Sequence, residues 1–275
     1  MTSAYWDEQQ AARYRAFQYD FPEKTLAAKT VIVAGGTGGL GAALVALLAR
    51  EGARLIVGYR SNHQRAEALA RAIERQTGQP LTLVAGELSA PETRRAYLER
   101  VRALPGGFSA LAGAAIFSGE PARTPLSELD CETMEASLRA NYIGPLLLAR
   151  DLGASLAATG KDAGIVLIAT MQALAVFPGS VNYAGAKAAL VHAARILATE
   201  WPRVRVNVVA PGATVVGMAE ASVRSGKYDF ALERGAIARF GRPEDVARAV
   251  RFFLEPDNYL TGQVLLVDGG LTLRR

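Results

Sequence analysis

Short apolar runs alternate with amphipathic segments from Lys29 to the end of the chain. Seven of these runs are rich in Val, Ile, Leu and Ala, and they predict strands over residues 30–35, 53–59, 81–86, 109–116, 164–170, 205–211 and 263–269. The segments between them carry apolar residues at helical spacing. Alternating strands and helices are typical of a doubly wound parallel sheet, whose strands are apolar because helices cover both faces. We therefore predict an α/β fold with one Rossmann-type sheet.

The first 28 residues differ from the rest because aromatic side chains are concentrated there, namely Tyr5, Trp6, Tyr14, Phe17, Tyr19 and Phe21. The spacing in this segment predicts a helix over residues 7–19. We expect residues 1–28 to form an arm that buries its rings on its own domain or on a neighbouring subunit. A role in substrate binding is the less favoured alternative. Residues 29–275 contain no stretch typical of an interdomain linker, so we expect them to form one Rossmann-type domain.

Composition excludes several other classes of protein. The chain of 275 residues is half apolar, and its length suits one large domain. No apolar run is long enough to cross a bilayer, and the first residues carry acids, so we expect neither a membrane span nor a secretory signal. The lone Cys131 cannot form an internal disulfide, which favours a reducing cytoplasm. His63 and His192 are isolated, so no metal site is expected.

The net charge of +5 raises the possibility of a nucleic-acid partner. The excess comes from Arg residues on helices where acids are interleaved, as in residues 63–76. This pattern indicates solvated helix faces, and no basic block is joined to an aromatic stacking motif. We therefore expect no nucleic-acid site, although a mild positive field can attract a phosphorylated cofactor.

A glycine-rich loop joins the first predicted strand to a helix over residues 35–41. Its spacing fits both G-x-G-x-x-G and G-x-x-x-G-x-G. The backbone of such a loop can approach a pyrophosphate, and the helix end that follows favours an anion. The alternative is a tight turn that only packs the helix on the strand. If the loop holds a dinucleotide, the expected contacts are Gly35, Thr37, Gly38, Gly39, Leu40 and Gly41.

The second predicted strand ends in Tyr59-Arg60-Ser61. An NAD-dependent enzyme usually offers a carboxylate to the adenosine ribose at this place, and no acid is present here. Arg60 and Ser61 can bind a ribose 2′-phosphate through charge-assisted hydrogen bonds, although an Arg after a strand is often merely solvated. The segment therefore favours NADP(H) over NAD(H).

Tyr183 and Lys187 are four residues apart at the start of a predicted helix, so they lie on one face of it. Their position roughly 140 residues after the glycine loop resembles the short-chain dehydrogenase/reductase family. The resemblance extends from Lys29 to the C-terminus and is nearest to the 3-oxoacyl-thioester reductase and glucose-dehydrogenase-like branch. Three further segments agree with it in order: Asn141-Tyr142-Ile143-Gly144, Val206-Asn207-Val208-Val209-Ala210-Pro211-Gly212, and the region 241–270.

The resemblance implies an oxidoreductase that acts on a carbonyl or secondary alcohol substrate, with Tyr183 as its acid–base. Lys187 would lower the pKa of Tyr183 and bind the nicotinamide ribose. Thr170, which stands where the family has Ser, would donate a hydrogen bond to the substrate oxygen. Asn141 would hold a water in the proton relay. Further cofactor contacts are expected at Glu87, Leu88, Ala114, Pro211, Gly212 and Thr214.

The chain departs from the family pattern at three places. Thr170 replaces the Ser, Gly113-Ala114-Ala115-Ile116 stands for the usual N-N-A-G, and Val216 occupies the place of a hydroxyl residue, with Thr214 two residues earlier. These departures leave open a catalytically silent member that serves as an NADP(H)-binding sensor or scaffold. An epimerase- or dehydratase-like member is disfavoured because such enzymes usually carry a longer substrate domain.

Residues 215–240 are expected to form a lid over the substrate. They carry the apolar and aromatic side chains of Met218, Tyr228, Phe230 and Ile237 beside the charges of Arg224, Lys227 and Arg234. We expect each single charge there to be solvated, and the mixed lid leaves the substrate and the direction of reaction open. The resemblance also implies a homotetramer, or else a dimer, paired through Ala/Leu-rich helices near residues 132–156 and 183–200.

Overall fold

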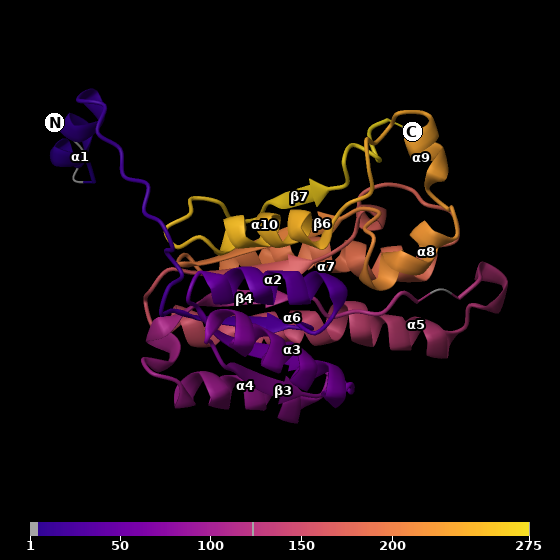
Figure 1. Ribbon diagram of the computed structural model, residues 1–275, viewed down its shortest axis with the longest axis horizontal. Coiled ribbons are helices and arrows are strands. Elements are labelled where there is room, and N and C mark those ends of the chain that lie inside the picture. Colours follow the sequence, from indigo (N-terminus) through magenta and orange to yellow (C-terminus); the bar gives the residue numbers. More distant parts are fainter. Residues whose placement is uncertain (1–4, 123, 275) are drawn as a thin grey trace.

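The computed structural model describes residues 5–122 and 124–274. A parallel sheet in the order β3-β2-β1-β4-β5-β6-β7 runs through its centre (Figure 1). Its strands are β1 (Thr30–Ala34), β2 (Arg54–Tyr59), β3 (Leu81–Ala85), β4 (Leu111–Ile116), β5 (Ala163–Ile168), β6 (Val204–Pro211) and β7 (Val264–Val267). Each begins and ends within two residues of its predicted range. The predicted fold class is confirmed.

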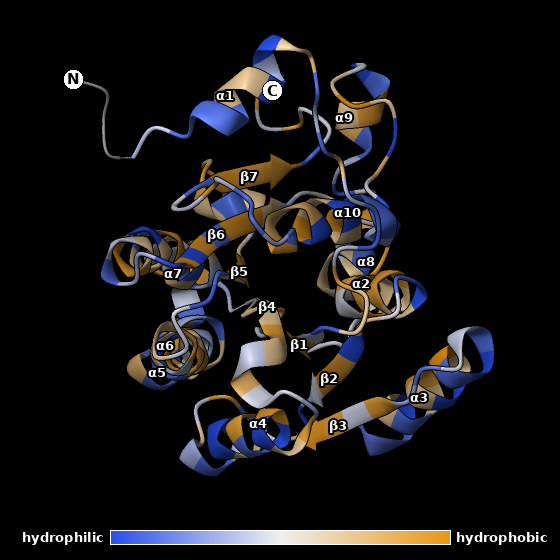
Figure 2. Ribbon diagram, turned by 90° about the vertical axis from the view of Figure 1, so that its left-hand side faces the viewer, coloured by the Kyte–Doolittle hydropathy of each residue, from blue (hydrophilic) through white to orange (hydrophobic). Residues whose placement is uncertain are grey.

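Helices cover both faces of the sheet (Figure 2). One face carries α2 (Gly39–Arg50), α3 (His63–Thr77) and α10 (Pro243–Leu254), and the other carries α4 (Pro91–Ala103), α6 (Gly144–Ala157) and α7 (Val181–Glu200). Successive strand residues point to opposite faces. In β1, Val31 and Val33 enter one core, while Ile32 and Ala34 enter the other. This is why the strands are apolar at most positions.

The order of the strands determines where a ligand can enter. The chain runs outward from β1 to β2 and β3, and then crosses back to β4 on the other side of β1. The loops after β1 and β4 therefore diverge, and they open a crevice at the carboxyl ends of these strands.

The remaining elements are α1 (Glu8–Arg15), α5 (Cys131–Leu138), α8 (Glu220–Arg224), α9 (Asp229–Glu233), the 3₁₀ turns η1 (Gly107–Ala110), η2 (Leu126–Glu128), η4 (Met171–Ala173) and η5 (Gly217–Ala219), and the π-helical turn η3 (Arg139–Ile143).

The amino-terminal arm projects away from the sheet domain (Figure 1). Its helix α1 is shorter than predicted; it begins after Asp7, whose carboxylate accepts a hydrogen bond from the Gln10 amide at 2.9 Å. No residue of α1 is buried, and the rings of Phe17 and Phe21 are 82% and 86% exposed. The expectation that the arm buries its rings on its own domain is therefore wrong. Burial on a neighbouring subunit remains a prediction.

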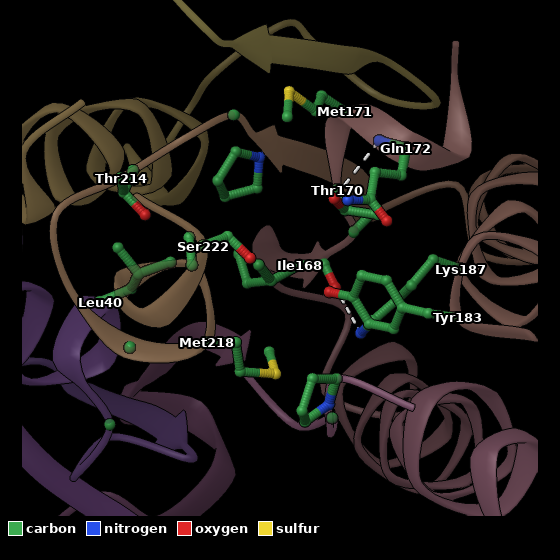
Figure 3. A pocket seen from close by; sticks show the side chains of 18 of the residues that line it. Leu40, Ile168, Thr170, Met171, Gln172, Tyr183, Lys187, Thr214, Met218 and Ser222 are labelled. Carbon is green, nitrogen blue, oxygen red and sulfur yellow. Dashed lines mark hydrogen bonds between the residues drawn. The ribbon is translucent and has the colours of Figure 1, made fainter. Parts of the chain in front are cut away.

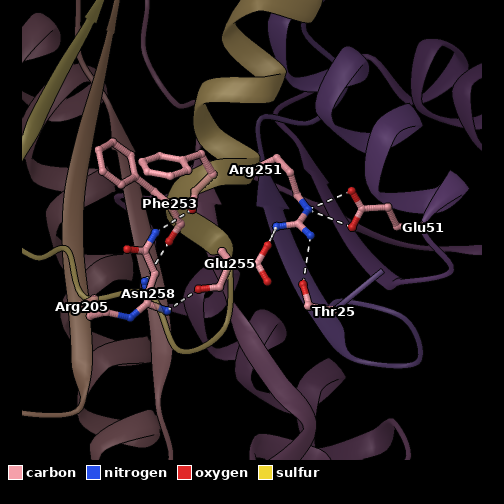
Figure 4. A network of polar contacts seen from close by, with 8 residues as sticks. Thr25, Glu51, Arg205, Arg251, Phe253, Glu255 and Asn258 are labelled. Atoms are coloured by element: carbon pink, nitrogen blue, oxygen red, sulfur yellow. Dashed lines mark hydrogen bonds and ion pairs between the residues drawn. The ribbon is translucent and has the colours of Figure 1, made fainter. Parts of the chain in front are cut away.

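A cluster of charged groups fixes the root of the arm (Figure 4). The guanidinium of Arg251, on α10, contacts both carboxylate oxygens of Glu51 at 2.8 Å and donates to the Thr25 hydroxyl at 3.0 Å. It also pairs with Glu255, whose backbone carbonyl accepts from Arg205 of β6 at 3.0 Å. We call this cluster the Arg251 clamp. All its members lie at the amino ends of the strands, opposite the crevice.

Candidate active site

A pocket of about 300 Å³ opens at the carboxyl ends of β1, β4, β5 and β6 (Figure 3). Helix α7 and the lid segment close its sides. Eleven of the expected catalytic and cofactor residues line it, namely Gly35, Gly38, Gly39, Leu40, Gly41, Thr170, Tyr183, Lys187, Pro211, Gly212 and Thr214. Gly35 and Thr214, which are 179 positions apart in the chain, are thus brought to one cavity at the predicted edge of the sheet.

The glycine loop has the shape of an anion site. A Cβ on Gly41 would lie 2.6 Å from the Gly35 carbonyl oxygen, so loop and helix approach too closely for any side chain. Gly38 is the N-cap residue of α2 and has no side chain that could cover the first backbone amides of the helix. The first turn of α2 contains no acidic residue. A Cβ on Gly38 would meet only the Gly35 carbonyl, at 3.4 Å, so this position is open. Bare amides at the positive end of a helix fit the pyrophosphate of a dinucleotide.

Two arginines follow β2, namely Arg60 directly after the strand and Arg65 on α3. Arg60 and Ser61 follow the strand and are exposed. Arg65 was not anticipated from the sequence; its Nε donates to the Thr37 carbonyl at 2.6 Å. Asn62 holds Arg65 in the first turn of α3 by accepting from its amide at 3.0 Å. This N-cap is the one sequence signal that could have pointed to Arg65.

Tyr183 and Lys187 lie on the first two turns of α7, as predicted, and both face the pocket (Figure 3). The Lys187 side chain is 1% exposed, and its ammonium donates to the backbone carbonyls of Ile168 at 2.9 Å and Ser118 at 3.0 Å. The Thr170 hydroxyl lies close enough to Tyr183 to lower the pKa of its phenol, and it accepts from the Gln172 amide at 3.3 Å. Two hydroxyls and one amino group therefore meet at one side of the pocket.

Burial shifts the pKa values of this pair in opposite directions. It raises the pKa of Tyr183 to about 12, against the smaller lowering effect of the hydrogen bond from Thr170. It lowers the pKa of Lys187 to about 7. Among the protein's own groups, desolvation therefore outweighs the expected lowering of the Tyr183 pKa by Lys187. A phenol that stays neutral can give its proton to a carbonyl oxygen.

Asn141 lies fully buried on the π-helical turn η3. Pro145 has no N–H, so the Ala140 carbonyl, five residues earlier, lacks a π-helical donor. The Ser118 hydroxyl supplies one at 3.3 Å, and the Asn141 side-chain oxygen accepts from the Glu120 amide at 3.1 Å. The π turn thus holds the loop whose Ser118 carbonyl binds Lys187. The Ser118 hydroxyl is directed to this contact, which leaves Thr170 as the better placed donor to a substrate.

The loop after β4 corrects one prediction and adds a residue. Ala114 lies inside β4, is fully buried and does not line the pocket, so its expected cofactor contact is wrong. The strand runs on to Ile116, and the residues that turn into the pocket are Phe117, Ser118 and Gly119. Gly119 was not anticipated. A Cβ there would lie 2.5 Å from the Asn141 oxygen and 3.2 Å from the Lys187 nitrogen.

Glu87 and Leu88 follow β3 and do not line the pocket. Leu88 is buried, and its carbonyl accepts from the Arg94 guanidinium at 2.8 Å. Arg94 is held in turn by Asp151 of α6 at 2.9 Å. The backbone after β3 is therefore fixed, while cofactor contacts of Glu87 and Leu88 remain predictions.

The lid segment contributes Val216, Met218, Ser222, Lys227 and Tyr228 to the pocket wall. Figure 3 shows Met218 and Ser222 across the cavity from Tyr183. Phe230 and Ile237, which were expected in the lid, do not line the pocket, and Ile237 is buried behind it.

The described part of the chain contains no group of His, Cys, Asp and Glu side chains that could hold a metal ion. None of its helices is both long enough and apolar enough to cross a membrane.

A family model described as enoyl-(acyl carrier protein) reductase matches residues 34–272. The chain belongs to the short-chain dehydrogenase/reductase family. It is 30% identical over 246 residues to a 3-oxoacyl-[acyl-carrier-protein] reductase of Aggregatibacter actinomycetemcomitans, covering 88% of this chain and 99% of the relative. It is 28% identical over 252 residues to glucose 1-dehydrogenase of Gluconobacter oxydans, covering 90% and 93%.

Two solved structures have a similar fold. A short-chain type dehydrogenase/reductase from Mycobacterium ulcerans shares the fold with a TM-score of 0.83 at 24% identity, covering 91% of this chain and 92% of that one. The L-sorbose reductase of Gluconobacter frateurii, solved with NADPH and L-sorbose, has a TM-score of 0.79 at 25% identity, covering 90% and 98%. This short-chain dehydrogenase/reductase is therefore an oxidoreductase of a family that uses a nicotinamide cofactor.

Proposed function

We propose that this short-chain dehydrogenase/reductase reduces a carbonyl compound with NADPH, or oxidises the secondary alcohol in reverse, with Tyr183 as the acid–base. The observation that carries the proposal is that the Tyr183 phenol, the Thr170 hydroxyl and the buried Lys187 line the same pocket as the glycine loop. When bound, NADPH supplies a hydride to the carbonyl carbon and becomes NADP⁺, so the protein has to deliver one proton to the oxygen.

Each side chain has a distinct part in this delivery. Tyr183 keeps its proton at neutral pH because burial raises its pKa to about 12, and it donates that proton to the substrate oxygen. The Thr170 hydroxyl donates to the same oxygen and stabilises the negative charge that develops there. Lys187, with a pKa lowered to about 7, can gain or lose a proton near neutrality and so restore the proton of Tyr183. Asn141 positions the loop that binds Lys187.

The preference for NADP(H) rests on charge at the end of β2. Arg65 contacts the glycine loop through the Thr37 carbonyl, and Arg60 and Ser61 are exposed directly after β2. A 2′-phosphate can form charge-assisted hydrogen bonds with these groups, and no carboxylate follows Tyr59 to bind the ribose of NAD(H). The NADPH bound by the L-sorbose reductase supports this proposal by analogy.

Tyr183→Phe tests the central role. The variant removes one hydroxyl, so NADPH binding should persist while ketone reduction falls by about 10²–10⁴-fold. Tyr142→Phe, on the π turn outside the pocket, is the matched control and should keep wild-type turnover. If Tyr183→Phe reduces ketones as well as the wild type, another group is the proton donor. Cofactor binding by the wild type without turnover of any ketone or diketone would favour the silent sensor instead.

We further propose that the chain forms a homotetramer, with a dimer as the alternative. Exposed apolar side chains lie on the helices expected to pair, namely Met134, Leu138, Ile143 and Ile196. A cytoplasmic location fits the single, exposed Cys131. Light scattering at micromolar concentration checks the assembly, and a monomer there would exclude both states.

A further inference from the structure

The charges of the pocket are of one sign. Among the described residues that line it, the only charged side chains are Lys187 and Lys227, and no Asp or Glu takes part. Lys187 is buried, and its ammonium is bound to two backbone carbonyls. Lys227 comes from the lid and is exposed. A cleft lined by one sign of charge attracts ligands of the opposite sign.

The lid holds Lys227 at the pocket by a short, anchored turn. The amide of Lys227 donates to the Ser222 carbonyl at 3.2 Å, which closes the turn between α8 and α9. The next residue, Tyr228, is 4% exposed and packs with Met171 and Ala213 at the ends of β5 and β6. Because Tyr228 is packed in this cluster, the backbone of Lys227 is held at the edge of the pocket.

The charge of Lys227 is not neutralised by a neighbour. Its ammonium lies 5.9 Å from the centre of the Tyr228 ring, and it forms no ion pair within the described part of the chain. Arg224, on the preceding helix, pairs instead with Glu220 at 3.5 Å and does not line the pocket. Of the three lid cations expected to be solvated, Lys227 alone faces the cavity.

Lys227 also lies on the side of the pocket where the chemistry occurs. The phenols of Tyr228 and Tyr183 are close enough to interact electrostatically. Gln172, next to the strand end that carries Thr170, supplies a polar amide, and Ser222 supplies a hydroxyl from the opposite side of the cavity (Figure 3). An anionic group that leaves water here would therefore meet one ammonium and further hydrogen-bond donors.

We infer that the substrate is a small carbonyl compound that carries a carboxylate or phosphate, and that Lys227 binds this anion while Tyr183 and Thr170 bind the carbonyl oxygen. This inference rests on the proposed function. A neutral ketone or sugar would leave Lys227 in water and gain nothing from it, so Lys227 is a specificity-determining residue. The reaction itself is unchanged, with one hydride and one proton added across the carbonyl bond.

Matched pairs of substrates test the inference with purified full-length protein and NADPH. The carboxylate arm compares pyruvate, acetoacetate and 4-oxopentanoate with their methyl esters, and the phosphate arm compares dihydroxyacetone phosphate with dihydroxyacetone. For at least one pair, the wild type should prefer the anion by about tenfold or more in kcat/KM. Lys227→Gln should lose roughly ten- to hundredfold on that anion, mainly through KM, and remain within about threefold on its neutral partner.

Two variants and one binding measurement make the result specific. Lys227→Arg keeps the charge and should retain the preference for the anion, and Arg224→Gln should behave as the wild type because that guanidinium lies outside the pocket. A saturated carboxylate or phosphate monoester of the preferred chain length should inhibit the wild type competitively, and this inhibition should be lost in Lys227→Gln.

Equal use of anionic and neutral partners by both wild type and Lys227→Gln would overturn this inference and leave carbonyl reduction in place. Absence of turnover with every carbonyl compound, charged or neutral, would instead overturn the proposed function and this inference together.

Discussion

Replacing Gly119 by alanine would add one methyl group where the loop after β4 meets Asn141 and Lys187. The new Cβ would lie 2.5 Å from the Asn141 oxygen and 3.2 Å from the Lys187 nitrogen. The first distance is roughly 1 Å shorter than a normal non-bonded contact, so the Asn141 side chain has to move. This movement breaks the 3.1 Å hydrogen bond that its oxygen accepts from the backbone N–H of Glu120. The backbone φ of +153° adds strain for any side chain, of about 1–3 kcal/mol.

A displacement of about 1 Å among catalytic groups can reduce turnover by roughly 10²-fold. We therefore expect Gly119→Ala to remain folded, with a kcat for NADPH-dependent ketone reduction lowered by about that factor. Thermal unfolding should show a Tm lower by about 4–8 °C for a loss of about 2 kcal/mol. Both quantities are measured on the same preparation, so a loss of kcat is separated from a loss of folded protein.

Gly185→Ala is the matched control, because Gly185 lies between Tyr183 and Lys187 on α7. A Cβ there would meet no atom within 4 Å, so kcat should not change. Alanine also favours the helix, and the free energy of unfolding should rise by about 0.5–1 kcal/mol. A Gly119→Ala enzyme with kcat within about twofold of the wild type would refute the view that Gly119 positions Asn141 and Lys187.

Two further predictions concern pH and the cofactor. Alcohol oxidation needs Tyr183 as a base, and burial raises the pKa of Tyr183 to about 12, so kcat/KM for oxidation should rise with pH between about 7 and 10. Reduction uses the neutral phenol and should not need alkaline pH. An oxidation rate that does not rise over this range would point to another base. The double variant Arg60→Gln, Arg65→Gln should raise the KM for NADPH by about tenfold or more and leave the KM for NADH nearly unchanged, as measured by initial rates; a wild type that uses NADH as well as NADPH would contradict the assignment of the 2′-phosphate site.

The strands could be predicted from the sequence because helices bury both faces of the sheet, which makes most strands nearly continuous apolar runs. The arm could not, because its aromatic spacing carries no information about what the rings contact. Its helix ends at Arg15, and Phe17 takes a φ of +57°, which helical periodicity does not reveal. Tyr14 and Tyr19 stack on each other with ring centroids 6.0 Å apart, instead of on the domain.

At the site, local patterns were informative and long-range contacts were not. The glycine loop and the Tyr183–Lys187 pair are each contained within one turn or one helix, so local spacing, together with the family resemblance, identified them. Arg65 reaches the carbonyl of a residue 28 positions earlier, and Gly119 meets a side chain 68 positions later, so neither contact follows from local spacing. Ala114 was placed wrongly because an unbroken apolar run does not reveal where the backbone leaves the sheet.

The Arg251 clamp and the pocket lie at opposite ends of the sheet, the clamp at the amino ends of the strands and the pocket at their carboxyl ends. Changes in the ion pairs among Arg251, Glu51 and Glu255 would therefore alter the tolerance to heat and salt without touching the groups that handle the substrate. Heat tolerance and substrate choice can for this reason evolve separately. The arm leaves the domain at the end of the sheet that carries the Arg251 clamp. A second protein fused to the amino terminus would therefore lie far from the entrance of the pocket.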